Sequence, residues 1–232
     1  MLLLGLTKTT LLDYPGKVAA TVFTGGCNFR CPFCHNGHLV TSAFTQDTIT
    51  AESVLDHLTK RRNVLQGVCI SGGEPTLQAD LPEFISLIKE LGYDVKLDTN
   101  GSHPNVIKQL IDNKLIDYVA MDVKNSKEKY LETACCSKEH LNNVEMSMEI
   151  LRTSGLPYEF RTTVVRQFHD TEDLKKIAKW IEWTPCWYIQ SYKDSENVIK
   201  QGFSAYTKEE LDEMVESIKE ISNINVLLRG VE

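Results

Sequence analysis

The run Val18-Ala19-Ala20-Thr21-Val22-Phe23, which ends at Gly25-Gly26, sets the class of fold. It is short, apolar and partly β-branched, so it predicts a buried β-strand. Residues 50–62 follow with helical spacing of their apolar side chains, and Thr50 is a plausible N-cap. Residues 67–71 form a second apolar run that again ends at two glycines. A strand, a helix and a strand in this order predict a parallel βαβ unit.

The same alternation continues along the chain. Further strands are predicted at 94–97, 118–121, 158–165 and 187–190, and further helices at 79–91, 104–112, 140–152, 171–183 and 208–221. Eight strand-helix units would close a barrel, whereas six predict an α/β fold built as a partial (β/α)6 TIM-like barrel. The last apolar run, 226–228, is either an edge strand or a docking tail. We expect one domain over 1–232, with a core at about 16–192 and a C-terminal helix and tail at 203–232.

Composition excludes several classes of protein. Hydrophobic residues make up 42% of the 232 residues and charged residues 25%, as in soluble globular chains. The net charge of −7 argues against nucleic acid as a partner. No stretch approaches the roughly 20 apolar residues of a membrane span. The opening Met1-Leu2-Leu3-Leu4 is too short for a signal sequence, so we expect a cytoplasmic protein with no membrane partner.

Seven cysteines require an explanation, because disulfides are rare in the reducing cytosol and an odd number cannot pair completely. Cys27, Cys31 and Cys34 lie within eight residues, separated by gaps of three and two. Three thiolates on one loop can hold three corners of an iron-sulfur cube and leave one iron open to an external ligand. The spacing favours such a cluster. Structural zinc with His35 as the fourth ligand and incidental buried thiols remain open as alternatives.

Polar residues follow the other predicted strands, at the edge where chemistry is expected in parallel α/β folds. Each group alone is compatible with a turn, a cap or a solvated ion pair, and their placement after successive strands is what favours a site. They are, in chain order, Gly72-Gly73-Glu74-Pro75, Asp98-Thr99-Asn100-Gly101, Asp122-Val123-Lys124, Arg161 within the fifth strand and Gln190 at the end of the sixth.

The C-x3-C-x2-C loop with Phe33 before its third cysteine, the Gly-Gly-Glu-Pro motif and the Asp-Thr-Asn-Gly motif together resemble the radical S-adenosylmethionine (SAM) superfamily over about 16–192. The Asp-x-Lys after the fourth strand resembles the glycyl-radical-enzyme activating enzymes. Gly16-Lys17, the run 23–36 and the segment 187–192 are most similar to the anaerobic ribonucleoside-triphosphate reductase activating proteins. The resemblance thus implies a partial barrel of the radical SAM core type.

The resemblance also implies an activity. Cys27, Cys31 and Cys34 would hold a [4Fe-4S] cluster, and the reduced cluster would cleave SAM to methionine and a 5′-deoxyadenosyl radical. That radical would remove a hydrogen atom from a glycine of the anaerobic ribonucleoside-triphosphate reductase. The chain would be a radical SAM oxidoreductase, reduced by an electron donor such as flavodoxin or ferredoxin.

SAM-binding roles follow from the same resemblance. The carbonyls of Gly72 and Gly73 would accept from the SAM amino group, because no Cβ blocks approach, and Glu74 completes that motif. Phe33 and His35 would line the adenine pocket.

Charged and amide side chains would bind the carboxylate, the amino group, the ribose and the nucleoside of SAM. Lys124 would pair with the SAM carboxylate, while Asp98, Asp122 and Asn100 would bind the amino group or the ribose. Arg161 lies on an apolar strand and would need an anionic partner, either SAM or a neighbouring carboxylate. Gln190 occupies the position from which the family contacts the nucleoside.

Two other functions remain open. One is a radical SAM enzyme acting on a small molecule, similar to 7-carboxy-7-deazaguanine synthase, and the other is a non-catalytic zinc-binding module. For the activase, a glycine loop of the partner would enter between the segments 36–44, 124–136 and 191–202. Lys127 and Lys129 in the second segment could attract an acidic surface of the reductase.

Overall fold

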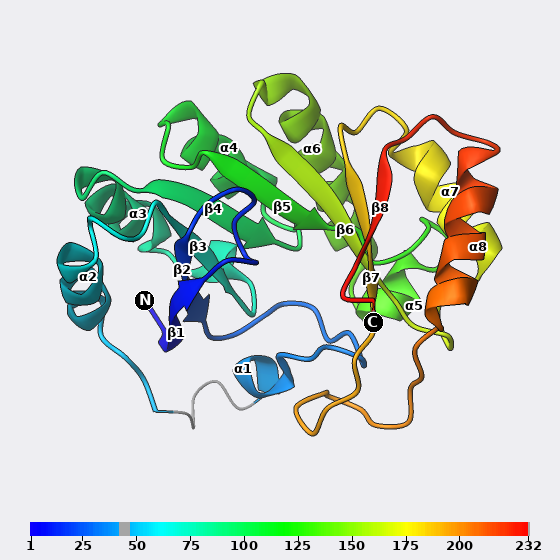
Figure 1. Cartoon of the computed structure of the whole chain (residues 1–232), viewed down its shortest axis with the longest axis horizontal. Helices are drawn as coiled ribbons and strands as arrows, with labels where there is room; N and C mark the ends of the chain where they lie inside the picture. The colour runs from blue at the N-terminus through cyan, green and yellow to red at the C-terminus, as the bar shows by residue number, and fades with distance from the viewer. Residues whose placement is uncertain (42–46, 232) are drawn as a thin grey trace.

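The fold is built on one curved sheet, shown in a computed structural model that describes residues 1–41 and 47–231 (Figure 1). Within these residues the sheet has eight strands in the order of the sequence. Strands β2 to β8 are parallel to their neighbours, and β1 is antiparallel to β2. Their bounds are β1 Leu3–Thr10, β2 Ala19–Thr24, β3 Gly67–Gly72, β4 Asp94–Thr99, β5 Tyr118–Asp122, β6 Tyr158–Val164, β7 Trp187–Ser191 and β8 Val226–Arg229.

The longer helices lie along the outer side of this sheet, from α2 at one end to α8 at the other (Figure 1). Thr50 caps α2 as expected, through a hydrogen bond from the Ser53 amide to the Thr50 hydroxyl. Reciprocal capping boxes begin α6, α7 and α8. The bounds are α1 Gly37–Thr41, α2 Ala51–Lys60, α3 Leu81–Glu90, α4 Pro104–Asp112, α5 Tyr130–Ala134, α6 Lys138–Ser154, α7 Thr171–Trp180 and α8 Lys208–Lys219, with a 3-10 turn at Pro75–Leu77.

The six predicted strands are confirmed, and the sheet has one further strand at each edge. β8 resolves the alternative for the last apolar run, because it pairs with β7 as a parallel edge strand. β1 was not predicted, since its antiparallel pairing with β2 is a tertiary contact that no local pattern indicates. The short helices α1 and α5 lie in segments expected to be loops.

The two faces of the sheet have opposite character, because side chains alternate between faces along a strand. One face packs on the helices and forms a continuous apolar core that includes Val68, Ile70, Val95, Leu97 and Val119, all fully buried. The alternate positions carry polar side chains that bond to one another, within one strand or between strands. The polar face includes Ser71, Lys96, Asp98, Glu159 and Arg161.

A buried carboxylate joins the last strand to the sheet. Glu159 on β6 is fully buried and accepts hydrogen bonds from the Tyr118 hydroxyl at 3.0 Å and from Arg229 Nη1 at 2.9 Å. The Arg229 guanidinium also lies over the ring of Tyr188, 3.7 Å from its centroid. Arg229 therefore connects β8 to β6 across β7.

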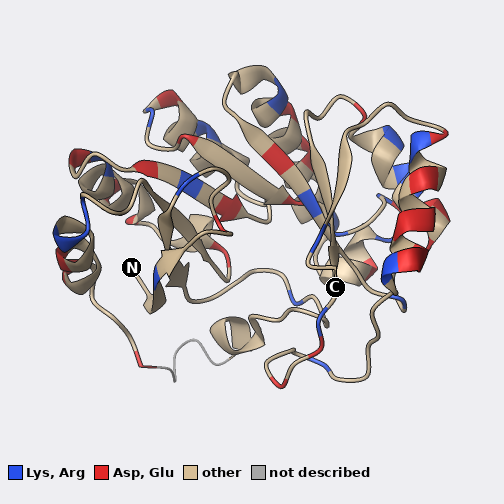
Figure 2. Ribbon diagram, viewed as in Figure 1, with Lys and Arg blue, Asp and Glu red and all other residues tan. Residues whose placement is uncertain are grey.

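Charge on the outside is mixed. Figure 2 shows basic and acidic residues interleaved along the outer helices, with acidic residues predominating on α8. Among the helices of the described residues, none is both long and apolar enough to span a bilayer.

Arg229→Met should lower the free energy of unfolding by about 2–3 kcal/mol, because it leaves the buried Glu159 carboxylate with one partner, while the partial exposure of Arg229 softens the loss. Urea denaturation of the variant and the wild-type protein measures this change in the free energy of unfolding. Lys108→Met is the control, since its ion pair with Asp112 is exposed and should contribute less than about 0.5 kcal/mol. Equal losses in the two variants would contradict the role given to Arg229.

Candidate functional site

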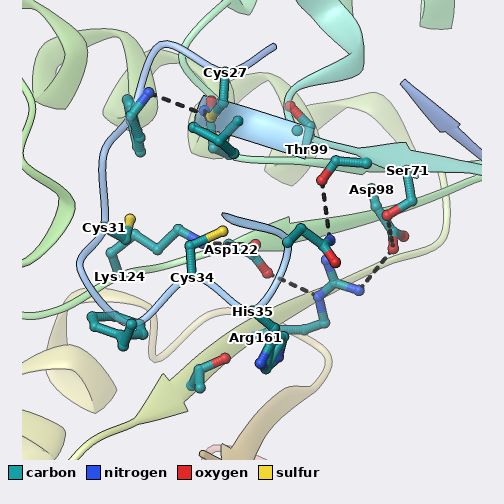
Figure 3. A pocket seen from close by; sticks show the side chains of 18 of the residues that line it. Cys27, Cys31, Cys34, His35, Ser71, Asp98, Thr99, Asp122, Lys124 and Arg161 are labelled. Atoms are coloured by element: carbon teal, nitrogen blue, oxygen red, sulfur yellow. Dashed lines mark hydrogen bonds and ion pairs between the residues drawn. The ribbon is translucent and has the colours of Figure 1, made fainter. Parts of the chain in front are cut away.

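A cavity of about 240 Å³ opens at the carboxyl ends of the parallel strands (Figure 3). It lies where the fold class predicts a site, between the ends of β3 to β7 and the loop that follows β2. Every site residue predicted from the sequence lines it, apart from Glu74. These residues are Cys27, Cys31, Phe33, Cys34, His35, Gly72, Gly73, Asp98, Asn100, Asp122, Lys124, Arg161 and Gln190.

The three cysteines of the loop after β2 all face this cavity. Cys31 is the most buried of them, and its Sγ lies 3.8 Å from the carbonyl oxygen of Ala134 at the end of α5. The same carbonyl accepts from the Arg30 amide at 3.1 Å. Phe33 is 4% exposed, with its ring 5.4 Å from that of Phe168. The loop is therefore anchored from behind by α5 and by an aromatic contact.

Burial controls the acidity of these thiols. It raises the pKa of Cys27 to about 11 and that of Cys31 to about 12, and it also raises the pKa of Cys34. The positive charge of Lys124 opposes the rise at all three, so it favours the thiolate form that binds metal. Loading iron onto the three thiols releases protons.

The donor set fits an iron-sulfur cube better than a single ion. Three unpaired thiols converge on one cavity, and a cube takes each of them at a different iron. A single zinc needs its ligands at the corners of one small tetrahedron, about 2.3 Å from the metal. Over residues 1–41 and 47–231, no three His, Cys, Asp or Glu side chains are grouped closely enough for that.

A buried network of charges forms the opposite wall of the cavity (Figure 3). Arg161 on β6 donates from Nη1 to Asp98 at 3.1 Å and from Nε to Asp122 at 2.9 Å. Lys124 Nζ pairs with the other oxygen of Asp122 at 2.9 Å, and the Ser71 hydroxyl donates to Asp98 at 3.1 Å. Of the two partners considered for Arg161, the structure provides the neighbouring carboxylates.

The cations keep both carboxylates ionised. Burial alone would raise the pKa of Asp98 and Asp122, but Arg161 and the nearby lysines hold both below the ordinary value. Burial would likewise lower the pKa of Lys124, and Asp122 instead raises it. The cavity wall is thus fully charged at neutral pH.

Close backbone packing explains why glycine stands at positions 72 and 73. A Cβ on Gly72 would lie 2.3 Å from the backbone nitrogen and oxygen of Thr24, and one on Gly73 would lie 2.0 Å from the carbonyl oxygen of Gly26. The missing side chains therefore allow the ends of β2 and β3 to pack backbone against backbone beside the cavity that both glycines line. The Gly72 carbonyl accepts from Asn36 Nδ2 at 3.2 Å, which ties this exit to the cysteine loop.

Glu74 lies behind the cavity wall and is fully buried. Its carboxylate accepts from the Thr76 hydroxyl at 2.5 Å, the Thr99 hydroxyl at 2.8 Å and the Asn100 amide at 2.6 Å. Asn100 Nδ2 in turn donates to Asn28 Oδ1 at 2.9 Å. Glu74 thus orders the Asp-Thr-Asn-Gly turn against the cysteine loop, and its place in the structure is that of a positioning residue.

Several residues of the site were not identified from the sequence. Ser71 and Thr163 line the cavity from strand positions that alternate with the apolar core, so the period of two was the available signal for them. Thr99 lines the cavity from the last position of β4, in phase with the apolar Val95 and Leu97. His169 is buried, and its Nε2 lies 2.8 Å from the Lys124 carbonyl oxygen, a contact that fixes the backbone of that lysine. No local pattern indicates it. Phe29, Asn36 and Val40 complete the lining.

The family model for the radical SAM superfamily matches residues 21–181. A protein of Methanocaldococcus jannaschii named as a glycyl-radical enzyme activating enzyme is 38% identical over 193 residues, which are 82% of this chain and 79% of that protein. The pyruvate formate-lyase-activating enzyme of Listeria monocytogenes is 31% identical over 188 residues, covering 75% of this chain and 73% of that enzyme.

Solved structures show the same fold. A radical SAM methyltransferase from Sphaerobacter thermophilus superposes with a TM-score of 0.74 at 14% identity, covering 96% of this chain and 69% of that one. Streptococcus suis SuiB bound to S-adenosylmethionine gives 0.69 at 16% identity, covering 88% of this chain. The chain spans about half the length of SuiB, at 48%.

The chain is a radical SAM enzyme, with the partial-barrel fold and the cofactors of that superfamily, a [4Fe-4S] cluster and SAM. Within the superfamily it belongs with the glycyl-radical enzyme activating enzymes.

Replacing Cys27, Cys31 or Cys34 singly with Ala should abolish the visible absorption of the anaerobically reconstituted cluster, because each thiol is one of only three local ligands. Cys135→Ala is the matched control, since Cys135 is an exposed thiol that does not line the cavity. Iron and sulfide analysis together with the absorption spectrum measures the outcome. A Cys31 variant that keeps a full complement of iron would contradict the assignment.

Lys124→Ala should weaken SAM binding by about 1.5–3 kcal/mol, the range for a charge-assisted hydrogen bond, because the cation that faces the thiols is lost. Equilibrium dialysis with labelled SAM on the reconstituted protein measures the dissociation constant. Lys60→Ala, which removes an exposed ion pair with Asp56, should leave it unchanged. An unaltered dissociation constant in the Lys124 variant would rule out this role.

Proposed function

We propose that this chain activates a glycyl radical enzyme, and that its substrate is the anaerobic ribonucleoside-triphosphate reductase. The observation that carries the first part is the cysteine loop and the charged wall facing each other across one cavity, in a chain whose relatives are named as glycyl-radical enzyme activating enzymes. The second part rests on the resemblance of the segments 23–36 and 187–192 to the activating proteins of that reductase.

Different residues of the cavity would bind the cluster and the separate parts of SAM. Cys27, Cys31 and Cys34 would bind the cluster, and Lys124 would hold the SAM carboxylate. When bound, the reduced cluster supplies an electron that splits SAM into methionine and a 5′-deoxyadenosyl radical. Asp122 orients Lys124 through their 2.9 Å ion pair.

Other cavity residues would bind the rest of the cofactor. Asp98 and Asn100 have acceptors for the amino group or ribose hydroxyls, and Gln190 on β7 lines the cavity and would contact the nucleoside. Phe33 and His35 would flank the adenine. Hydrogen-atom abstraction needs no general base, so the remaining task of the protein is to position these groups and to exclude water.

The partner would enter through the rim of the cavity. Of the three segments expected there, residues 42–44 lie outside the described part of the chain. Lys127 pairs with Glu145 and also lies 5.0 Å from the centroid of the Trp180 ring, and Lys129 pairs with Asp173 at 2.5 Å. These ion pairs weaken the case for the two lysines as an attraction for an acidic partner surface, because their charges are already compensated.

An external donor must reduce the cluster, and we propose a flavodoxin or a ferredoxin for this step. All seven cysteines are free thiols in the structure, which fits a reducing compartment such as the cytoplasm.

The test is anaerobic incubation of the reconstituted protein with SAM, a reductant and the purified reductase, followed by electron paramagnetic resonance. We expect a glycyl-radical signal on the reductase and formation of 5′-deoxyadenosine. Pyruvate formate-lyase is the matched alternative substrate, because one relative is the activating enzyme of that protein.

The outcomes separate the hypotheses. A signal on pyruvate formate-lyase alone would keep the activase and replace its partner. SAM cleavage without a radical on either protein would favour a small-molecule enzyme of the 7-carboxy-7-deazaguanine synthase type, and a purine-like product from the pterin substrate would identify it. One zinc per chain with no iron after reconstitution would favour the binding module.

A further inference from the structure

Lys96 on β4 is a fully buried cation for which the SAM site described above gives no role. The residue is 1% exposed, and it points to the polar face of the sheet, where Nζ pairs with Asp98 Oδ1. Its other polar contact is with the Cys69 thiol at 3.8 Å. Lys96 does not line the cavity, so it approaches the ligand only through Asp98.

Lys96 lies at one end of a network in which positive and negative side chains alternate. It bonds one oxygen of Asp98, and the other oxygen of Asp98 accepts from Arg161. Arg161 also bonds one oxygen of Asp122, whose other oxygen accepts from Lys124 at the cavity surface. Each carboxylate thus has a cation on both sides.

The network of Lys96, Asp98, Arg161, Asp122 and Lys124 holds three cations and two anions. The buried Glu159 also acts on Arg161, but it is paired with Arg229, so the network carries one excess positive charge. Bringing an unbalanced charge into a buried site is costly unless an anion meets it. The inner end, at Lys96, is closed by protein, whereas the outer end, at Lys124, faces the cavity. The excess charge is therefore met at Lys124, where the thiolates of the cysteine loop and a ligand in the cavity both face it.

We propose that Lys96 is a positioning residue that neutralises Asp98 from behind and so leaves the charge of Lys124 free for the carboxylate of SAM. Without Lys96, Asp98 and Asp122 would share Arg161 and Lys124, and the network would be neutral. Lys124 would then be fully committed to Asp122. The inference rests on the proposed SAM site, and it assigns a role to a residue that does not touch the cofactor.

The experiment compares two ligands on the anaerobically reconstituted protein: SAM and decarboxylated SAM, which lacks only the carboxylate. In the wild-type protein SAM should bind more tightly than decarboxylated SAM. The dissociation constant of decarboxylated SAM divided by that of SAM measures how much the carboxylate contributes to binding. Lys96→Met keeps the length of the side chain and removes its charge. It should reduce this ratio about tenfold, while the binding of decarboxylated SAM changes less than about twofold.

Three further variants control the result. Lys96→Arg keeps the charge and should retain the ratio. Lys89→Met removes a half-buried lysine that pairs with Asp117 at 2.7 Å on the helical side, and it should leave both dissociation constants unchanged. The double variant Lys96→Met/Asp98→Asn restores one excess positive charge, so it should regain the ratio even where its binding of both ligands is weaker. It also removes the buried carboxylate that the single variant leaves with Arg161 as its one paired cation, so it guards against a folding defect.

If Lys96→Met weakens the binding of SAM and of decarboxylated SAM equally, Lys96 has only a structural role. If Lys96→Met changes the binding of neither ligand, Lys96 has no role in binding. Either result overturns the inference. A double variant that fails to regain the ratio does so as well. A wild-type protein that binds SAM and decarboxylated SAM equally would instead contradict the carboxylate role of Lys124, and the glycyl-radical assay tests the choice of partner separately.

Discussion

The site depends on one guanidinium shared between two carboxylates. Arg161 on β6 bonds Asp98 on β4 and Asp122 on β5, so three neighbouring strand ends are held together by buried charges. A buried charge left without its partner costs several kcal/mol, roughly 3–5 when one member of a pair is removed. The spacing of these strand ends, and with it the width of the cavity, is fixed by that requirement.

The rest of the cavity is arranged around this charged wall. The cysteine loop is held at the right distance by contacts between main chains, with the exits of β2 and β3 packed closely at Gly72 and Gly73. Asn36 of the loop donates to the Gly72 carbonyl at the end of β3, and Asn100, which follows β4, donates to Asn28 of the loop. The thiols and Lys124 thus lie on the same cavity, and Lys124 acts on all three thiols. A buried ion network is often no more stable than an apolar core of the same size, so we attribute it to ligand binding and not to stability.

Much of this arrangement could be predicted from the sequence, because local patterns encode it. The period of apolar residues located six strands within a few residues of their ends, and the rule that parallel strands end together placed the motif residues in one cavity. β1 and the connection of β8 to Glu159 could not be predicted in this way, since both are contacts between distant segments. The sequence also did not show that the glycine pair serves backbone packing, or that Glu74 lies behind the wall.

The central claim is that the cavity holds SAM against the open iron of a cluster bound by three cysteines. Electron-nuclear double resonance of the reduced, cluster-loaded protein tests it most directly, with SAM carrying nitrogen-15 in its amino group and oxygen-17 in its carboxylate. We expect both labels to couple magnetically to the cluster. Bound SAM with no coupling from either label would contradict it.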